Sequence, residues 1–141
     1  MIRAYQPEDL PVLLHIWLEG NLDAHSFVPA EYWRGQMPGV QEALPCAELL
    51  IEEEAGNIRG FLGLQGENIA GIFVAREARR KGVGRLLLGE AKRRHGRLTL
   101  QVYEKNASAC RFYAANGFYK QTEQTDPDTG EREYHLVWMR P

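Results

Sequence analysis

One stretch of the chain combines basic side chains with glycines in a pattern suited to binding phosphate. It runs from Ile72 to Arg85, where an apolar strand leads into a basic loop and Gly82 and Gly84 open the next helix. Glycine allows close backbone approach to a ligand, and the first turn of a helix carries free N–H groups at its positive end. The stretch predicts a pyrophosphate cradle. Four side chains add positive charge to it: Arg79, Arg80, Lys81 and Arg85.

Two well-known phosphate loops do not match this stretch. A Walker loop needs Gly-Lys followed by Ser or Thr, but here Lys81 precedes Gly82 and Val83 follows. A dinucleotide fingerprint needs a third glycine three residues after Gly84, where the chain has Leu87. A solvated basic loop before an amphipathic helix remains the plain alternative.

A second stretch, residues 106–118, holds residues that could act on a leaving group. It predicts an amphipathic helix with Asn106 as its N-cap and Asn116-Gly117 as its C-terminal stop. Tyr113 on this helix is either a core aromatic residue or a hydroxyl that donates a proton.

Together the two stretches resemble the GNAT superfamily of N-acetyltransferases. The first matches its motif Arg/Gln-x-x-Gly-x-Gly/Ala, and the second matches Asn-x-x-Ala, then Phe-Tyr, then Gly-Phe. The matching residues are Arg79, Gly82 and Gly84, then Asn106, Ala109, Phe112-Tyr113 and Gly117-Phe118. Shorter matches, such as Tyr32-Trp33-Arg34 and Phe73-Val74-Ala75, are similar to small bacterial lysine acetyltransferases of the YiaC type.

The resemblance implies a fold and a cosubstrate. The expected fold class is α/β: a mixed, mainly antiparallel sheet flanked by helices, with one βαβ crossover at the cofactor site and one domain over 1–141. Acetyl-CoA would lie where strand 68–74 splays from strand 98–103. The expected cofactor-binding residues are Ile72, Phe73, Val74, Arg79, Arg80, Lys81, Gly82, Val83, Gly84, Arg85, Asn106 and Tyr113.

The implied reaction needs a base and an acid. A lysine amine has a pKa of about 10.4, so it must lose a proton before it attacks the thioester. Tyr113 is the expected general acid at the sulfur. Many relatives carry a carboxylate where this chain has Gln101, which cannot take that proton. Three other candidates for the base remain open: Glu67, His25 and Glu104, with a turn carboxylate, a packed or capping residue and an exposed acid as their plain alternatives.

Residues 22–45 are rich in aromatic side chains, and the resemblance places them at the acceptor entrance. Phe27, Glu31, Tyr32 and Trp33 are the expected substrate-binding residues, with His25 beside them. Aromatic walls can hold the methylene stem of a lysine, and a carboxylate attracts its ammonium. The expected activity is acetyl transfer to a primary amine, with a protein lysine first. A small amine or polyamine, and a CoA-binding regulatory module without catalysis, remain alternatives.

Composition limits the other classes of function. The 141 residues carry 17 Lys+Arg and 19 Asp+Glu, a net charge of −2, which argues against a nucleic-acid partner despite the short basic run. Two distant cysteines indicate no metal or disulfide framework. The chain begins without a signal peptide pattern and has no membrane-spanning apolar run. We therefore expect a cytoplasmic monomer or homodimer that needs no metal and does not bind membranes.

Hydrophobic periodicity then gives the elements that must position these residues. A helix starts at Pro7 and is expected to stop at Gly20-Asn21, and prolines predict only short helices over 22–45. An antiparallel meander is expected over 47–74. Further along, the pattern predicts helices over 82–95 and 106–115 and strands over 98–103, 118–123 and 134–139.

Overall fold

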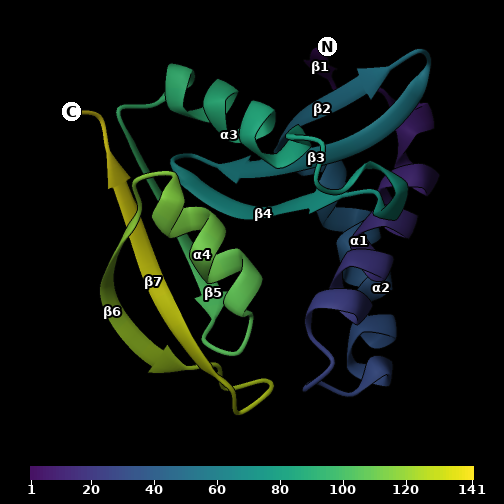
Figure 1. Cartoon of the computed structure of the whole chain (residues 1–141). Helices are drawn as coiled ribbons and strands as arrows, with labels where there is room; N and C mark the ends of the chain where they lie inside the picture. The colour runs from purple at the N-terminus through teal and green to yellow at the C-terminus, as the bar shows by residue number, and fades with distance from the viewer.

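The computed structural model describes residues 1–141, and Figure 1 shows them arranged around one seven-stranded sheet. The strand order is β1-β2-β3-β4-β5-β7-β6, and only β4 and β5 run parallel. The expected mixed, mainly antiparallel sheet is confirmed. The strands are β1 (Ile2–Ala4), β2 (Glu48–Glu54), β3 (Asn57–Gln65), β4 (Asn68–Val74), β5 (Arg97–Tyr103), β6 (Tyr119–Thr125) and β7 (Arg132–Met139).

Four helices cover the two faces of the sheet: α1 (Leu10–Ala24), α2 (Ala30–Ala43), α3 (Val83–Arg94) and α4 (Ala107–Ala115). Gly20 of α1 lies against the Phe73 ring, whereas Gly84 of α3 lies against Phe112 of α4 and near Val74. Phe73 and Val74 are neighbours in β4, so their side chains point to opposite faces. It follows that α1 packs on one face of the sheet and α3 and α4 on the other (Figure 1). We call these the α1 face and the α4 face.

The central strands form the core because both of their faces are covered. Phe61, Leu62 and Leu64 of β3 are each at most 1% exposed, which explains the near-continuous apolar run at 58–64. On the α1 face, the rings of Trp17 and Trp33 pack edge to face with centroids 6.1 Å apart.

The parallel pair β4–β5 is short, and the two strands then part. Pairing covers only Asn68 with Thr99 and Ile69 with Leu100, although β4 continues to Val74. The Asn68 side chain also donates to the Thr99 hydroxyl at 2.9 Å and closes this end. The βαβ crossover through α3 is confirmed, and the sheet opens on the carboxyl side of Ile69.

A β-bulge marks the point where the opening begins. Gly63 of β3 pairs with Gly71, but Leu64 pairs with Ile69, so Ala70 is an extra residue in β4. Bulges leave one residue outside the ladder and bend the strand that carries them. The bulge therefore helps to turn β4 away from β5.

The helices at the N-terminal side differ from the sequence-based prediction. The first helix continues past Gly20-Asn21 to Ala24, because Asn21 is buried and its amide Nδ2 donates to the Trp17 carbonyl at 3.0 Å. One continuous helix, α2, replaces the expected short helices, and Pro38 lies inside it at an exposed position. None of the helices combines the length and apolar character that crossing a bilayer requires. The structure gathers no group of three or more His, Cys, Asp or Glu side chains able to hold a metal ion.

Candidate active site

The loop that enters α3 presents a row of free backbone donors. The first backbone bond of α3 runs from the Leu86 N–H to the Gly82 carbonyl, at 3.0 Å. Every N–H from Arg80 to Arg85 is left without a protein acceptor. These are the groups that the sequence assigns to a pyrophosphate.

Two residues of this loop have left-handed backbone conformations. Gly82 has φ of 80° and Arg80 has φ of 64°, the latter unusual for a residue with a side chain. Left-handed residues close together turn successive N–H groups toward one concave side, which suits an anion. A Cβ at Gly82 would meet nothing within 4 Å, so the space beside this backbone is open to a ligand.

The basic side chains around the loop divide into two groups. Arg79 donates to Asp23 of α1 at 2.8 Å, and Arg76 holds the same carboxylate at 2.9 and 3.0 Å. These hydrogen bonds keep the pKa of Asp23 below its usual value. Arg79 therefore ties the loop to α1 and does not extend its guanidinium into the cradle. The three cations without a partner are Arg80, Lys81 and Arg85, all exposed.

The free edge of β4 offers backbone groups to the opening. The Ala75 N–H donates to Arg59 on the β3 side at 2.8 Å, and successive residues of a strand point to alternate edges. Phe73 therefore pairs with β3, while Ile72 presents its backbone groups to the opening. Val74 presents its N–H there, and its carbonyl accepts from Nε of Arg79 at 3.3 Å. Of the predicted trio, these two lie on the edge of β4 that faces the opening, and their contact with a cofactor stays a prediction. The Phe73 ring instead lies on the α1 face.

Tyr113 lies on α4 among core aromatic residues. Its ring packs edge to face with Phe112 and Phe118, with centroids 5.3 and 5.5 Å apart. Its hydroxyl makes no hydrogen bond within the protein, and burial raises the pKa of Tyr113 above its usual value. A protonated phenol without a competing partner suits proton donation at neutral pH, so the general-acid role stays a prediction that this geometry favours.

Asn106 caps α4 and contacts His25 from the α1–α2 connection. Its Oδ1 accepts from the Ala109 N–H, and its Nδ2 lies 3.2 Å from Nε2 of His25. Burial lowers the pKa of His25 to about 4, so the ring is neutral at pH 7. A ring nitrogen that already accepts from Asn106 and binds protons weakly is a poor base. The structure thus places His25 beside the predicted cofactor contact without favouring it as the proton acceptor.

The two acidic candidates for the base are each held by a neighbouring side chain. The Glu67 carboxylate accepts from Arg97 at 2.7 Å, at the end of β4 that stays paired with β5. The Glu104 carboxylate is exposed and accepts from the Tyr134 hydroxyl at 2.9 Å. Neither carboxylate forms a hydrogen bond with the free edge of β4. The structure therefore does not favour Glu67 as the base.

The predicted acceptor residues separate into rim and core. Trp33 is only 7% exposed and packs on Trp17, so it belongs to the core. Phe27 packs against Tyr103 with centroids 5.6 Å apart, and Tyr32 donates to Asp128 at 3.3 Å. Phe27 and Tyr32 thus face the end of β5 and the β6–β7 turn. Glu31 is exposed in the first turn of α2.

Sequence reasoning missed the acids of the β6–β7 turn. Asp126 accepts from the Tyr103 hydroxyl at 2.5 Å, and Asp128 accepts from Tyr32. These contacts join segments up to 96 residues apart, and no local pattern reports them. We call Phe27, Tyr32, Asp126 and Asp128 the acidic-aromatic rim.

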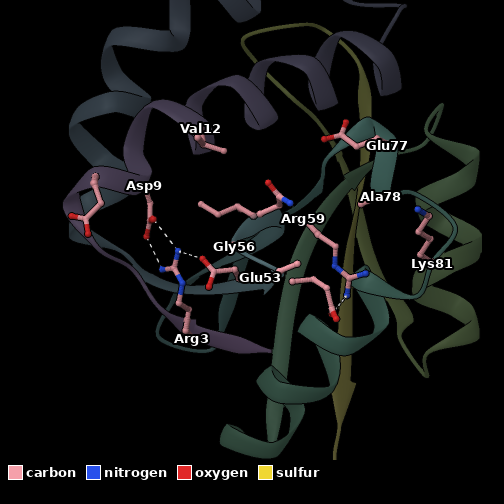
Figure 2. Close-up of a pocket in the computed structure, with 14 residues that line it drawn as sticks. Arg3, Asp9, Val12, Glu53, Gly56, Arg59, Glu77, Ala78 and Lys81 are labelled. Atoms are coloured by element: carbon pink, nitrogen blue, oxygen red, sulfur yellow. Dashed lines mark hydrogen bonds and ion pairs between the residues drawn. The ribbon is translucent and has the colours of Figure 1, made fainter.

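Two pockets lie near these elements. An apolar one of about 160 Å³ lies on the α1 face beside the bulge, and its lining includes Trp17, Ala70 and Phe73. A larger one, of about 870 Å³, lies between the start of α1, the β2–β3 turn and the loop before α3. Figure 2 shows Arg3 there between the carboxylates of Asp9 and Glu53, at 2.8 and 3.0 Å. Arg3 is therefore already paired and not free to bind an anion, whereas Lys81 of the cradle loop also lines this pocket.

The comparison with protein families agrees with this geometry. Residues 45–120, which include β4, the cradle loop and α4, match the acetyltransferase (GNAT) domain model. This chain belongs to the GNAT acetyltransferase family. The family membership predicted from the two motifs is confirmed.

Relatives within the GNAT family include bacterial lysine acetyltransferases. The chain is 41% identical over 121 residues to the peptidyl-lysine N-acetyltransferase YiaC of Escherichia coli, covering 84% of this chain and 83% of YiaC. It is 32% identical to the peptidyl-lysine N-acetyltransferase YjaB of the same organism, covering 96% and 92%. The solution structure of apo YjaB from E. coli superposes with a TM-score of 0.88 at 28% identity, covering 100% of this chain and 98% of that one.

Proposed function

We propose that this protein transfers the acetyl group of acetyl-CoA to the side-chain amine of lysine residues in other proteins. The observation that carries the proposal is the opening between β4 and β5, with free N–H groups from Arg80 to Arg85 at one end. An opening of this kind would admit a long cosubstrate between the two strands. The names of YiaC and YjaB support lysine as the acceptor.

Each part of the opening has a role in this proposal. The backbone of the cradle loop binds the pyrophosphate, and Arg80, Lys81 and Arg85 neutralise its charge. Ile72 and Val74 bind the pantetheine arm in the manner of an added strand. The free edge of β4 continues the surface formed by the cradle loop. The glycines and free donors of this surface therefore fit a long cosubstrate with a pyrophosphate better than an isolated phosphate ion.

In this scheme the amine and the general acid reach the thioester from opposite faces of the sheet. The amine approaches from the α1 face and attacks the thioester carbon directly, forming the C–N bond. The C–S bond then breaks, and Tyr113 on the α4 face protonates the departing thiolate. The amine, which loses a proton, and the thiolate, which gains one, therefore lie on opposite faces of the sheet.

The acidic-aromatic rim suits a cationic acceptor. Asp126 and Asp128 attract an ammonium group, and the rings of Phe27 and Tyr32 can contact a methylene stem. The apolar pocket beside Ala70 has no charged lining residue, which suits an uncharged stem after deprotonation. We further propose that the chain acts as one domain, 1–141, as a monomer or homodimer in the bacterial cytoplasm, without a metal.

The experiment that tests this function is an acceptor panel followed through release of the free CoA thiol. It compares a lysine peptide with a blocked N-terminus, a lysine-free peptide with a free N-terminus, and spermidine. The lysine peptide is expected to give the highest kcat/KM. The Asp128→Asn variant should raise KM for that peptide by about threefold to tenfold, since one attractive charge is lost. The Glu42→Gln variant on exposed α2 is the matched charge control.

Other outcomes would replace the proposal. Acetyl-CoA binding without thiol release for any amine would favour a regulatory module. A preference for spermidine would favour a small-molecule acetyltransferase.

A further inference from the structure

The end of α1 contacts both sides of the opening between β4 and β5. Asp23, in the last turn of this helix, accepts hydrogen bonds from Arg76 and Arg79 of the loop that follows β4. His25, two residues later, contacts the other side. Its ring packs edge to face on Tyr103, the last residue of β5, with centroids 5.1 Å apart, and its Nε2 lies 3.2 Å from the side-chain amide that caps α4. One short segment therefore joins the loop after β4 to the end of β5.

The Asp23 carboxylate is shared by two arginines. Arg76 donates to it through both Nε and Nη2, at 3.0 and 2.9 Å, and Arg79 donates through Nη1 at 2.8 Å. Single exposed ion pairs stabilise a protein little, but two-pronged arginine–carboxylate contacts and networks of charges are the exception. Asp23 is the one carboxylate paired with Arg79, whereas Arg76 has a second partner in Glu19 at 3.5 Å. Loss of Asp23 would therefore release Arg79 before Arg76.

Arg79 extends this contact to the free edge of β4. While its Nη1 binds Asp23, its Nε donates to the Val74 carbonyl at 3.3 Å. Val74 is the last residue of β4, and the free N–H groups of the cradle begin at Arg80, directly after Arg79. The guanidinium thus lies where the edge of β4 meets the cradle, and it covers a carbonyl whose negative end would repel a pyrophosphate.

We propose that Asp23 is a positioning residue for acetyl-CoA, which through Arg79 holds the cradle loop and the end of β4 in the arrangement that binds the cosubstrate. This inference rests on the proposed function. It gives α1, the helix on the acceptor side, a part in cosubstrate binding, and it requires no contact between Asp23 and the cosubstrate.

Charge alone predicts the opposite effect of removing Asp23. A carboxylate close to an anion site repels the anion, so its loss should strengthen binding of a pyrophosphate. A positioning role predicts weaker binding, because the released loop must be ordered again each time the cosubstrate binds. The direction of the change in affinity therefore separates the two explanations.

The test measures the affinity of the whole chain for acetyl-CoA by calorimetry. Asp23→Asn removes the charge at nearly constant size, and Asp23→Glu keeps the charge on a longer side chain. Glu90→Gln is the matched control, because Glu90 also accepts from two arginines, but both of them, Arg93 and Arg94, belong to its own helix α3. Kinetics with the lysine peptide give kcat and both KM values, and thermal midpoints report folding.

The expected result is acetyl-CoA binding about fivefold to tenfold weaker in Asp23→Asn, with kcat and the KM for the peptide within about twofold of wild type. Asp23→Glu should bind acetyl-CoA more tightly than Asp23→Asn, since its carboxylate can still hold Arg79. Glu90→Gln should bind acetyl-CoA as the wild type does.

A double-variant cycle tests whether Asp23 acts through Arg79. Arg79→Gln alone should weaken acetyl-CoA binding by a similar factor. The double variant should then bind within about twofold of the weaker single variant, because one interaction is lost only once. Two effects that multiply would show that the residues act independently, and this outcome overturns the proposal.

Other results also overturn it. One is unchanged or tighter acetyl-CoA binding by folded Asp23→Asn, because a lower thermal midpoint with unchanged affinity marks a purely structural role. Another is equal affinity in Asp23→Asn and Asp23→Glu. If Asp23→Asn does not fold, Arg79→Gln decides, and unchanged affinity in that variant counts against the proposal.

Failure of the proposed function can be told apart from failure of this inference. A wild-type chain that does not bind acetyl-CoA removes both. Acetyl-CoA binding without turnover of any amine removes the proposed function, and the calorimetric comparison of the variants still decides the role of Asp23. Wild-type binding and turnover with an unaffected Asp23→Asn variant removes the role of Asp23 alone.

Discussion

His25 and Asn106 meet across the open end of the sheet, although 81 residues separate them in sequence. The Asn106 amide donates to Nε2 of His25 at 3.2 Å, and Nδ1 of the same ring pairs with Oδ1 of Asn21 at 3.0 Å. Asn21 in turn donates to Trp17 within α1. A chain of hydrogen bonds therefore links the helix on the α1 face to the cap of α4, and it holds the Asn106 amide in one orientation.

The burial of His25 gives the folded chain a dependence on pH. The pKa of His25 falls from 6.5 to about 4, so the unfolded chain takes up the proton first as pH decreases. The contribution of neutral His25 to the free energy of unfolding is intact above pH 6.5. It declines as pH falls toward 4, by at most about 3 kcal/mol. His25→Gln, which keeps both hydrogen-bonding partners, should lose less stability over that range. Urea unfolding at about pH 7 and about pH 5, above most carboxylate titration, measures the difference.

An equal loss of stability in wild type and His25→Gln would contradict this assignment. The carboxylates of the chain are common to both proteins, so they cancel in the comparison.

The cradle loop should be sensitive to a side chain at Gly82. With φ of 80°, alanine there is strained by about 1 kcal/mol, and the loop shifts its N–H groups. We expect Gly82→Ala to lower stability by about that amount and to weaken acetyl-CoA binding about tenfold in calorimetry. Gly89→Ala, in exposed α3 with nothing within 4 Å of its Cβ, is the control. This control should be more stable by about 0.5–1 kcal/mol and should bind acetyl-CoA with unchanged affinity. Unchanged affinity in Gly82→Ala would remove the loop from the cofactor site.

Tyr113 should affect turnover without affecting stability. Tyr113→Phe keeps the ring among Phe112 and Phe118 and removes only a hydroxyl that makes no hydrogen bond within the protein. The thermal midpoint and KM for acetyl-CoA should stay the same, and kcat should fall about 10²–10⁴-fold. Tyr134→Phe, which removes an exposed hydroxyl bonded to Glu104, should keep its kcat. Near-normal turnover in Tyr113→Phe would leave the thiolate without an assigned acid.

The sequence predicted the elements whose own periodicity decides them. The strands around 58–64 and 68–74 and the helix after Gly82 occur where the patterns put them, within a few residues. The end of the first helix was predicted wrongly, because Gly20 and Asn21 are usual helix stops. Here the Phe73 ring packs at Gly20, and tertiary contacts extend the helix.

Within the site, motif positions were easier to predict than side-chain partners. The free N–H groups from Arg80 to Arg85 follow from the glycines, but the pairing of Arg79 with Asp23 depends on where α1 docks. A Cβ at Gly84 would meet the Phe112 ring at 3.4 Å, so this glycine also permits the close packing of α3 on α4, and its predicted contact with the cofactor stays a prediction. Asp128 lies at the rim of the site through its contact with Tyr32, which no local spacing reports.

The central claim is acetyl transfer to a lysine side chain, and the most direct measurement is the position of the acetyl group in the product. A peptide with one lysine and a free N-terminus is incubated with acetyl-CoA and the wild-type chain, then sequenced by tandem mass spectrometry, with Tyr113→Phe as the control. The account predicts one added acetyl group on the lysine Nε, strongly reduced with Tyr113→Phe. Acetyl groups only on the N-terminal amine, or none despite bound acetyl-CoA, would contradict it.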